Sequence, residues 1–328
     1  MSSILVSGSI LKSRYKIERT IYEAPIVNIY YSQDIHMPGR FWAIREMQTV
    51  SNNPMERVAI TNKFLKESSI LSRLSHPVFA KVIDFFVDGI YLYIVRDFIP
   101  GADLSSLLES RTEPFLEEQV VNWGLQIADL FMYLSSQKIP PVFFKEFNMG
   151  NIILTPNGDI KVTDMGLARI FYADSALDAI GALGANEYAA PEQYDPENPT
   201  FDSRSLVFSI GAFMYHALTK VNPVMNFAEK TPIKPVDEIN PSVSPNLRDI
   251  LKRALELNPL KRFSSITEMK KHIASCVKPK QKAKSSSKGK ISKYSEPKSS
   301  GNNFFVIITI VLLSIICFLG YYFFFRGF

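Results

Sequence analysis

The sequence has few of the residues that build disulfide frameworks or metal clusters. Its 328 residues include two cysteines, Cys276 and Cys317, and four histidines that are scattered without metal-ligand spacing. Two cysteines cannot form a multi-bridge framework, and such sparse use suits a reducing compartment. A secretory signal peptide is not expected either, because residues 1–15 are weakly apolar and carry little charge.

Charge is absent from one stretch near the C-terminus. Residues 304–325 contain no Asp, Glu, Lys or Arg, and they show no polar face of the kind expected of a buried core helix. A helix of this length rises about 1.5 Å per residue, or roughly 33 Å, which is enough to cross the hydrocarbon core of a bilayer. Tyr321 and Tyr322 lie near its C-terminal end, where interfacial aromatic residues are favoured. The sequence therefore predicts one transmembrane helix over 304–325.

Positive charge is concentrated just before this apolar run. The chain has a formal charge of +5, but residues 278–298 carry eight lysines and one glutamate, which leaves −2 elsewhere. We therefore expect no general affinity for nucleic acid, and we interpret 278–303 as a Lys- and Ser-rich linker. Because lysine-rich flanks stay on the cytoplasmic side of a membrane, residues 1–303 are predicted to be cytoplasmic and 326–328 to form a short outer tail.

The remaining chain divides into a strand-rich part and a helix-rich part. Segments rich in β-branched and aromatic residues predict strands at 15–21, 26–34, 40–48, 81–88 and 92–98. One helix is predicted among them at 56–74, where apolar residues recur at helical spacing. Farther along, the patterns predict helices at 103–110, 117–138, 203–219, 245–256 and 264–275, and short strands at 152–155 and 160–163. The sequence thus predicts an α+β fold of two lobes plus one transmembrane helix.

Several motifs occur in one order along this region. They are "FLKESSILSRLSHP" with Glu67, "KVTDMGLAR" with Asp164, "GANEYAAPEQY" with Glu192, and "NPLKRFSS" with Arg262. In this order and at these separations they resemble a bacterial protein Ser/Thr kinase domain covering about residues 13–275. The resemblance implies a leader over 1–12, a β-rich N-lobe over 13–98 and a helical C-lobe over 99–277, next to a bacterial inner membrane.

The resemblance also implies ligands and roles. Kinases of this family use ATP and magnesium and transfer the γ-phosphate to protein hydroxyl groups. Asn151 and Asp164 would hold the metal. The alternative is that Asp164 forms a hydrogen bond with the backbone and that Asn151 caps the turn into 152–155. The nucleotide would be contacted by Ala43, Arg45, Glu67, Arg96 and Asp97. Glu192 and Arg262 would form a structural ion pair under the activation segment.

The catalytic stretch departs from the family at the residues that handle phosphate. "PPVFFKEFNMGN", residues 140–151, overlays "PPIIYRDLKPSN" of related kinases. The base position holds Glu146 in place of aspartate, and Asn148 replaces the lysine that neutralises the transferring phosphate. A misplacement of about 1 Å can cost about 10²-fold in rate, and Asn148 removes a cation outright. We therefore expect impaired phosphoryl transfer.

Glycine is missing from the loop that covers the phosphates in this family. Tyr22, Ala24 and Val27 occupy its three glycine positions, and Pro25 between them lacks a backbone N–H. The phosphate-binding lysine of the next strand is replaced by Arg45, whose planar fork is bulkier than an ammonium group. We therefore expect a lower affinity for ATP and magnesium.

Three more positions differ from the family. Ala185 replaces a threonine of the substrate-docking loop, and Leu206 replaces an aspartate that holds the catalytic loop. The gatekeeper position behind the adenine holds Arg96, a charge that is costly to bury unless a neighbouring acid pairs with it.

Two functions from different classes follow from these residues. In the first, the chain is a pseudokinase that binds other proteins at the membrane and regulates or scaffolds signalling. In the second, it is an atypical, weakly active Ser/Thr kinase with Glu146 as base, Arg45 on the phosphates, and Asp164 with Asn151 on magnesium. Rate losses in a coupled site are not additive, so the count of altered residues leaves both open.

Overall fold

The structure is a computed structural model, and it describes residues 4–49, 51–137, 147–163, 188–194, 200–224 and 233–277. All of them lie in one unit of the chain, Met1–Pro279. The predicted transmembrane helix and the lysine-rich linker lie outside the described residues. Among the described helices, none is long and apolar enough to cross a membrane.

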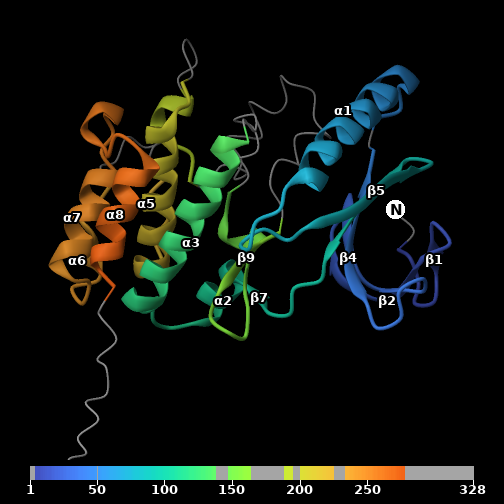
Figure 1. Cartoon of the computed structure of the whole chain (residues 1–328), viewed down its shortest axis with the longest axis horizontal. Coiled ribbons are helices and arrows are strands. Elements are labelled where there is room, and N and C mark those ends of the chain that lie inside the picture. Colours follow the sequence, from blue (N-terminus) through green and yellow to red (C-terminus); the bar gives the residue numbers. More distant parts are fainter. Residues whose placement is uncertain are drawn as a thin grey trace, which may run out of the picture. The chain divides into compact units, whose positions relative to one another are not determined.

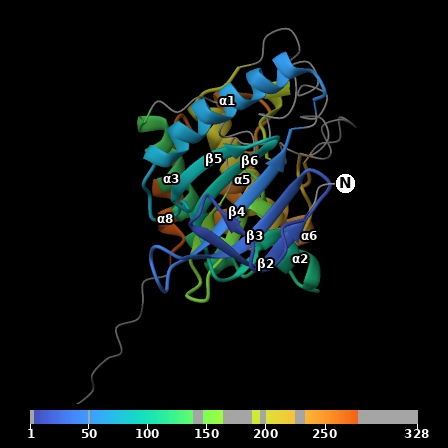
Figure 2. The ribbon, with the colours of Figure 1, turned by 90° about the vertical axis from the view of Figure 1, so that its right-hand side faces the viewer.

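The first lobe is built on an antiparallel sheet of six strands. In chain order these are β1 (Ile10–Leu11), β2 (Tyr15–Glu23), β3 (Val27–Asp34), β4 (Phe41–Gln48), β5 (Val82–Asp88) and β6 (Tyr91–Asp97). In space their order is β1-β2-β3-β4-β6-β5. Figure 2 shows this sheet with helix α1 (Pro54–Arg73) beside β5 and β6. The strand-rich half predicted from the sequence is confirmed.

Helix α1 starts two residues earlier than the apolar pattern predicts. The side chain of Asn53 accepts a hydrogen bond from the backbone N–H of Met55 at 2.9 Å, and Pro54 occupies the first helical position. Both are ordinary helix-start features, since proline needs no N–H donor there. The helix then buries Phe64, Ser68 and Leu71, one stripe at helical spacing.

The two faces of the sheet belong to different cores. Leu92 and Ile94 of β6 join the large core shared with α1 and the second lobe, and we call this side the inner face. The alternate residues Tyr93 and Val95 join a separate outer cluster with Leu11, Tyr15, Ile17, Tyr30, Trp42 and Ile44. Leu5 packs against the outer cluster and donates its N–H to the Tyr30 hydroxyl at 3.2 Å. Residues of the expected leader therefore cover part of the sheet.

The second lobe is mainly helical. Its helices are α2 (Leu104–Ser110), α3 (Glu117–Ser136), α5 (Ser203–Thr219), α6 (Val236–Ile239), α7 (Pro245–Ala254) and α8 (Ile266–Ser275), and its small sheet joins β7 (Ala102–Asp103), β8 (Ile152–Leu154) and β9 (Ile160–Val162). In the described part of this lobe, three short turns of 3-10 helix lie between them, Met149–Asn151, Pro191–Tyr194 and Pro259–Lys261. Figure 1 shows α3, α5, α7 and α8 side by side. The two-lobed α+β architecture predicted from the sequence is confirmed.

Close helix packing in this lobe depends on glycine. A Cβ atom on Gly124 of α3 would lie 2.7 Å from the Met214 sulfur, and one on Gly211 of α5 would lie 2.8 Å from the Ala254 Cβ. Both glycines let neighbouring helices approach, and their helices carry the residues that support the functional site described next.

Candidate functional site

The hairpin between β2 and β3 takes the place of a phosphate-binding loop. The N–H of Ala24 donates to the carbonyl of Val27 at 2.9 Å, so this amide is used inside the hairpin. Pro25 at the turn has no N–H to offer, and the carbonyl of Ile26 accepts from Gln48 at 2.9 Å. Tyr22, at the first glycine position, is 53% exposed. Because the Ala24 amide is used within the hairpin and Pro25 has none, fewer donors are available to an anion.

Arg45 and Glu67 face the same interface. Arg45 lies on β4 between its strand partners Ile29 and Ile94, on the inner face of the sheet. Glu67 lies on α1 next to Ser68, on the side of the helix that packs toward β5 and β6. The fold therefore places both residues between the sheet and α1.

Arg96 reaches from the first lobe to the second. Its Nη1 donates a hydrogen bond of 2.8 Å to the carbonyl of Thr163, the residue that follows β9. The residue is only 4% exposed. The structure shows this backbone carbonyl in contact with the guanidinium group, and pairing with a neighbouring acid stays a prediction. A charge-assisted hydrogen bond of this kind offsets part of the cost of burying the cation.

Asn148 has a structural role in the turn that precedes β8. Its side-chain Oδ1 accepts a hydrogen bond from the backbone N–H of Asn151 at 3.1 Å, and it caps the 3-10 turn Met149–Asn151. The carbonyl of Asn151 accepts both the N–H of Thr163 at 2.9 Å and its hydroxyl at 3.2 Å. The turn is therefore tied to the end of β9, and the capping side chain seen here belongs to Asn148.

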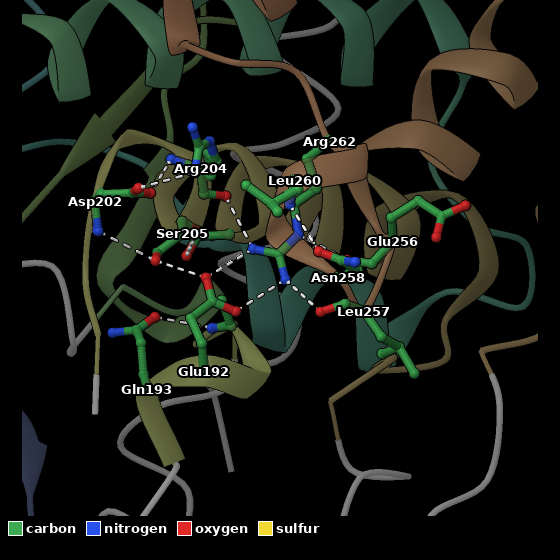
Figure 3. Close-up of polar contacts among 12 residues, drawn as sticks. Glu192, Gln193, Asp202, Arg204, Ser205, Glu256, Leu257, Asn258, Leu260 and Arg262 are labelled. Carbon is green, nitrogen blue, oxygen red and sulfur yellow. Dashed lines mark hydrogen bonds and ion pairs between the residues drawn. The ribbon is translucent and has the colours of Figure 1, made fainter. Parts of the chain in front are cut away.

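The predicted pair of Glu192 and Arg262 is present. Figure 3 shows the guanidinium group bonded to both carboxylate oxygens, with Nη1 to Oε1 at 2.8 Å and Nη2 to Oε2 at 2.9 Å. The Ser205 hydroxyl donates a third hydrogen bond to Oε1 at 2.7 Å. Burial by itself would raise the pKa of Glu192, but the hydrogen bonds from Arg262 and Ser205 hold it below its ordinary value.

Arg262 is held by more than its ion pair. Its guanidinium group also donates to the carbonyl oxygens of Glu256, Leu257 and Arg204 (Figure 3). The same group stacks over the ring of Phe208 at 4.8 Å. These contacts join helix α5 to the turn before α8. The arrangement positions the segment at Pro191–Tyr194, which ends the activation segment in the family.

Other predicted site residues have different surroundings. The Asp97 carboxylate accepts the N–H of Lys81 at 3.1 Å, which ties the ends of β5 and β6 together. Ala43 lies opposite Arg96 in the sheet and is 7% exposed. Leu206 is buried in the core of the second lobe. Glu146, Asp164 and Ala185 lie outside the described residues.

One contact was not predicted from the sequence. The hydroxyl of Tyr188 and Nδ1 of His216 on α5 are 2.7 Å apart, and the Tyr188 ring packs against Phe147 and Phe213. Burial lowers the pKa of His216 to about 4, so the imidazole is neutral at pH 7. No motif in the sequence points to His216, which is one of four scattered histidines.

Metal-binding potential in the described residues is limited. No group of three or more His, Cys, Asp or Glu side chains that could hold a metal ion occurs among them. The pair that the resemblance implies, Asn151 and Asp164, includes one residue outside this part of the chain.

Comparison with known proteins agrees with this fold. Residues 33–273 match the protein kinase domain family. The chain belongs to the protein kinase family. It is 24% identical over 273 residues to a probable serine/threonine-protein kinase of Clostridium perfringens, and the match covers 80% of this chain and 38% of that relative. It is also 24% identical over 277 residues to the probable serine/threonine-protein kinase PknB of Lactococcus lactis, with 81% and 42% covered.

Solved structures show the same fold. The PknI kinase domain of Mycobacterium tuberculosis superposes with a TM-score of 0.63 at 19% identity, covering 83% of this chain and 99% of that domain. The chain spans about two fifths of the length of the two curated relatives above. The shared region is therefore the kinase-like domain.

Proposed function

We propose that the protein is a membrane-tethered pseudokinase that binds other proteins and regulates or scaffolds signalling. The observation that carries the proposal is the role of Asn148. The position where the family has a phosphate-neutralising lysine holds a neutral side chain that caps the turn Met149–Asn151. A capping amide supplies no positive charge to a phosphate, so this side chain contributes structure and not phosphate neutralisation.

The hairpin between β2 and β3 supports the same proposal. Kinases need backbone donors over the phosphates, and here the Ala24 amide bonds to Val27 while Pro25 has none. By contrast, the contacts that support the fold are well made, above all the one between Glu192 and Arg262. The residues that stabilise the kinase fold are retained, while the backbone donors for phosphate are lost. This combination favours a role in binding other proteins over a role in catalysis.

A slow Ser/Thr kinase is the second candidate. It is favoured by the intact Glu192–Arg262 pair, which in active kinases positions the activation segment, and by relatives that are named as Ser/Thr kinases. In this candidate, Glu146 acts as base, Arg45 contacts the phosphates, and Asp164 with Asn151 holds magnesium. ATP and magnesium are its ligands.

Phosphate transfer by the full chain tests the proposal. The chain is purified in a mild detergent and incubated with magnesium and ATP labelled at the γ-phosphate, alone and with a generic basic protein substrate. The double variant Glu146→Ala, Asp164→Ala is the blank. We expect incorporation equal to the blank. If the full chain incorporated more label than the double variant, the pseudokinase proposal would be overturned in favour of the slow kinase.

The membrane tether is proposed on the apolar run 304–325 and the lysine-rich linker 278–303. Its test compares the full chain with a chain that ends at residue 303 during fractionation of cells. We expect the full chain in the membrane fraction, resistant to high salt, and the shortened chain in the soluble fraction. Equal distribution of the two would overturn the tether.

A further inference from the structure

The second lobe contains a groove of about 650 Å³ between helix α7 and the segment 233–237. Figure 1 shows α5, α6 and α7, which pack against one another around it. Its floor is apolar and is formed by four buried residues, Tyr215, Val236, Leu251 and Leu255. The volume falls within the range of ligand sites, which is about 300–1,000 Å³.

The two walls of the groove are fixed by hydrogen bonds. The Tyr215 hydroxyl donates to the carbonyl of Lys234 at 2.9 Å, which holds the first wall against α5. On the second wall, Arg248 of α7 pairs with Asp237 of α6 at 3.5 Å and donates to the carbonyl of Val243 at 2.6 Å. The groove is therefore formed without a partner, so binding requires little ordering of the protein.

Helix α7 and the residues after it give the groove its length. Pro245, Asp249, Lys252 and Glu256 line it at helical spacing. The first and last of these are eleven positions apart, which is roughly 16 Å at about 1.5 Å per residue. An extended chain rises about 3.3 Å per residue, so about five residues of a partner would lie along the groove. Because its alternate side chains point to one side, two or three of them would contact the apolar floor.

One end of the groove carries a carboxylate without a cation. Glu256 is half-buried, and its side chain makes no hydrogen bond or ion pair within the described part of the chain. The nearby arginines are engaged elsewhere, since Arg253 pairs with Glu268 at 2.8 Å and Arg262 pairs with Glu192 at 2.8 Å. A partly desolvated carboxylate attracts a cation more strongly than a fully hydrated one does. A basic side chain of a partner is therefore favoured at this end.

Apolar surface continues beside this carboxylate. Leu257 lines the same groove and is 55% exposed, so the apolar floor extends to the rim next to Glu256. The two lysines of the lining, Lys234 and Lys252, are exposed, and water hydrates their charges. The groove thus offers apolar contacts next to an unpaired acid, which complements apolar side chains next to a basic one.

We propose that this groove docks an extended segment of a partner protein in which apolar side chains alternate with a lysine or arginine that faces Glu256. The proposal rests on the protein-binding role proposed above, and it names the surface and the chemistry of the partner. The same end of the groove adjoins the ion pair of Glu192 and Arg262, because the backbone carbonyls of Glu256 and Leu257 accept hydrogen bonds from Arg262 (Figure 3). A docked partner would therefore lie next to the support of the activation segment.

Random dodecapeptides displayed on phage are the probe for this groove. They are selected on the full chain in mild detergent, and the Kd of each enriched peptide is measured by fluorescence anisotropy for the wild type and for Glu256→Lys and Leu257→Ser. Both substitutions keep the backbone carbonyls that bind Arg262. The controls are Glu113→Lys and Leu260→Ser, an exposed acid and an exposed leucine that do not line the groove.

We expect the enriched peptides to share alternating apolar residues and a basic residue. Their Kd should rise at least about tenfold in each groove variant and stay unchanged in each control. A peptide whose basic residue is replaced by glutamate should bind Glu256→Lys more tightly than it binds the wild type, which a general loss of structure would not produce. If Glu256→Lys does not fold, Glu256→Gln removes the charge without reversing it and should weaken binding in the same direction.

Three results would overturn the proposal. They are the enrichment of no peptide, equal binding of the enriched peptides to the wild type and both groove variants, and no preference of the glutamate peptide for Glu256→Lys. None of these results would restore phosphate transfer. Transfer above the blank, in turn, would overturn the pseudokinase proposal and leave the peptide groove in place.

Discussion

Glu192 and Arg262 form a two-pronged ion pair in which each carboxylate oxygen faces its own guanidinium nitrogen, with side chains 13% and 0% exposed. The pair joins the Pro191–Tyr194 turn to the loop before α8, two segments that are 70 residues apart in the sequence. Because the geometry is bidentate and the guanidinium is surrounded by carbonyl oxygens, the charge of Arg262 is well compensated in the interior.

Loss of this arginine is expected to destabilise the protein strongly. Arg262→Met would leave the Glu192 carboxylate buried without its cation, and removal of one partner of a buried pair costs about 3–5 kcal/mol. Chemical denaturation of the full chain measures the difference in the free energy of unfolding. The control is Lys16→Met, which breaks the half-exposed 3.1 Å pair with Glu18 and is expected to cost less than about 1 kcal/mol. Equal effects of the two variants would contradict the buried-pair assignment.

Loss of the cap on the Met149–Asn151 turn is expected to lower the free energy of unfolding by less than loss of Arg262 does. Asn148→Ala removes the acceptor of the Asn151 N–H, and loss of such a cap costs about 1 kcal/mol. Asn148→Asp retains an acceptor of the same length and is expected to stay within about 0.5 kcal/mol of the wild type. Thermal unfolding of the three chains under one buffer checks the order. An alanine variant as stable as the wild type would show that the amide has no capping role.

A buried carboxylate on the outer face of the sheet gives a third prediction. Glu46 is 2% exposed and accepts hydrogen bonds from Asn28 Nδ2 at 2.9 Å, the Tyr30 hydroxyl at 2.9 Å and the Tyr93 hydroxyl at 2.7 Å. Asn28, Glu46 and Tyr93 are direct partners across three strands, so the network ties β3, β4 and β6 together.

Removal of one phenol from this network is expected to be costly. Tyr93→Phe deletes a hydrogen bond to a charged group, which contributes about 1.5–3 kcal/mol to stability. The matched control is Tyr91→Phe, two residues earlier on the same strand, whose hydroxyl makes no hydrogen bond within the described part of the chain. Its effect should stay within about 0.5 kcal/mol. If denaturation gave the two variants the same stability, Glu46 would not depend on the Tyr93 hydroxyl.

Much of the fold could be predicted because its signals are local. Residues 26–34 are rich in β-branched and aromatic side chains, which predicts a strand, and β3 begins one residue after the predicted start. The predicted helix 117–138 ends at Ser136 instead, and 245–256 ends at Ala254. Helix ends are less predictable, because helix ends fray and the last turn often changes its hydrogen-bonding pattern.

The site was predicted less completely, because its contacts are distant in the sequence. The kinase motifs locate Arg96, but its contact with Thr163 spans 67 residues and follows only from the packing of the two lobes. Tyr188 and His216 likewise meet only after α5 packs against the end of the activation segment. The cap by Asn148 is local. Asparagine commonly caps the start of a turn, so the sequence alone could have indicated this role for the residue before Met149–Asn151.

The contact between Tyr188 and His216 predicts a stability change in mild acid. In the folded chain the pKa of His216 is about 4, below the ordinary 6.5, because burial disfavours the charged imidazole. Above pH 6.5 both states are neutral at this residue. As the pH falls from 6.5 to about 4, the unfolded chain binds a proton that the folded chain does not, so the free energy of unfolding decreases by up to about 1.4 kcal/mol per pH unit.

A variant without a titrating ring isolates this contribution. His216→Gln can still form a hydrogen bond with the Tyr188 hydroxyl but binds no proton in this range, so its melting temperature should fall less steeply than that of the wild type between pH 6.5 and 4. Between pH 7 and 8 the two melting temperatures should differ by a constant amount, because neither residue titrates there. Parallel curves over the whole range would mean that His216 is protonated equally in both states, and that its burial does not exclude the proton.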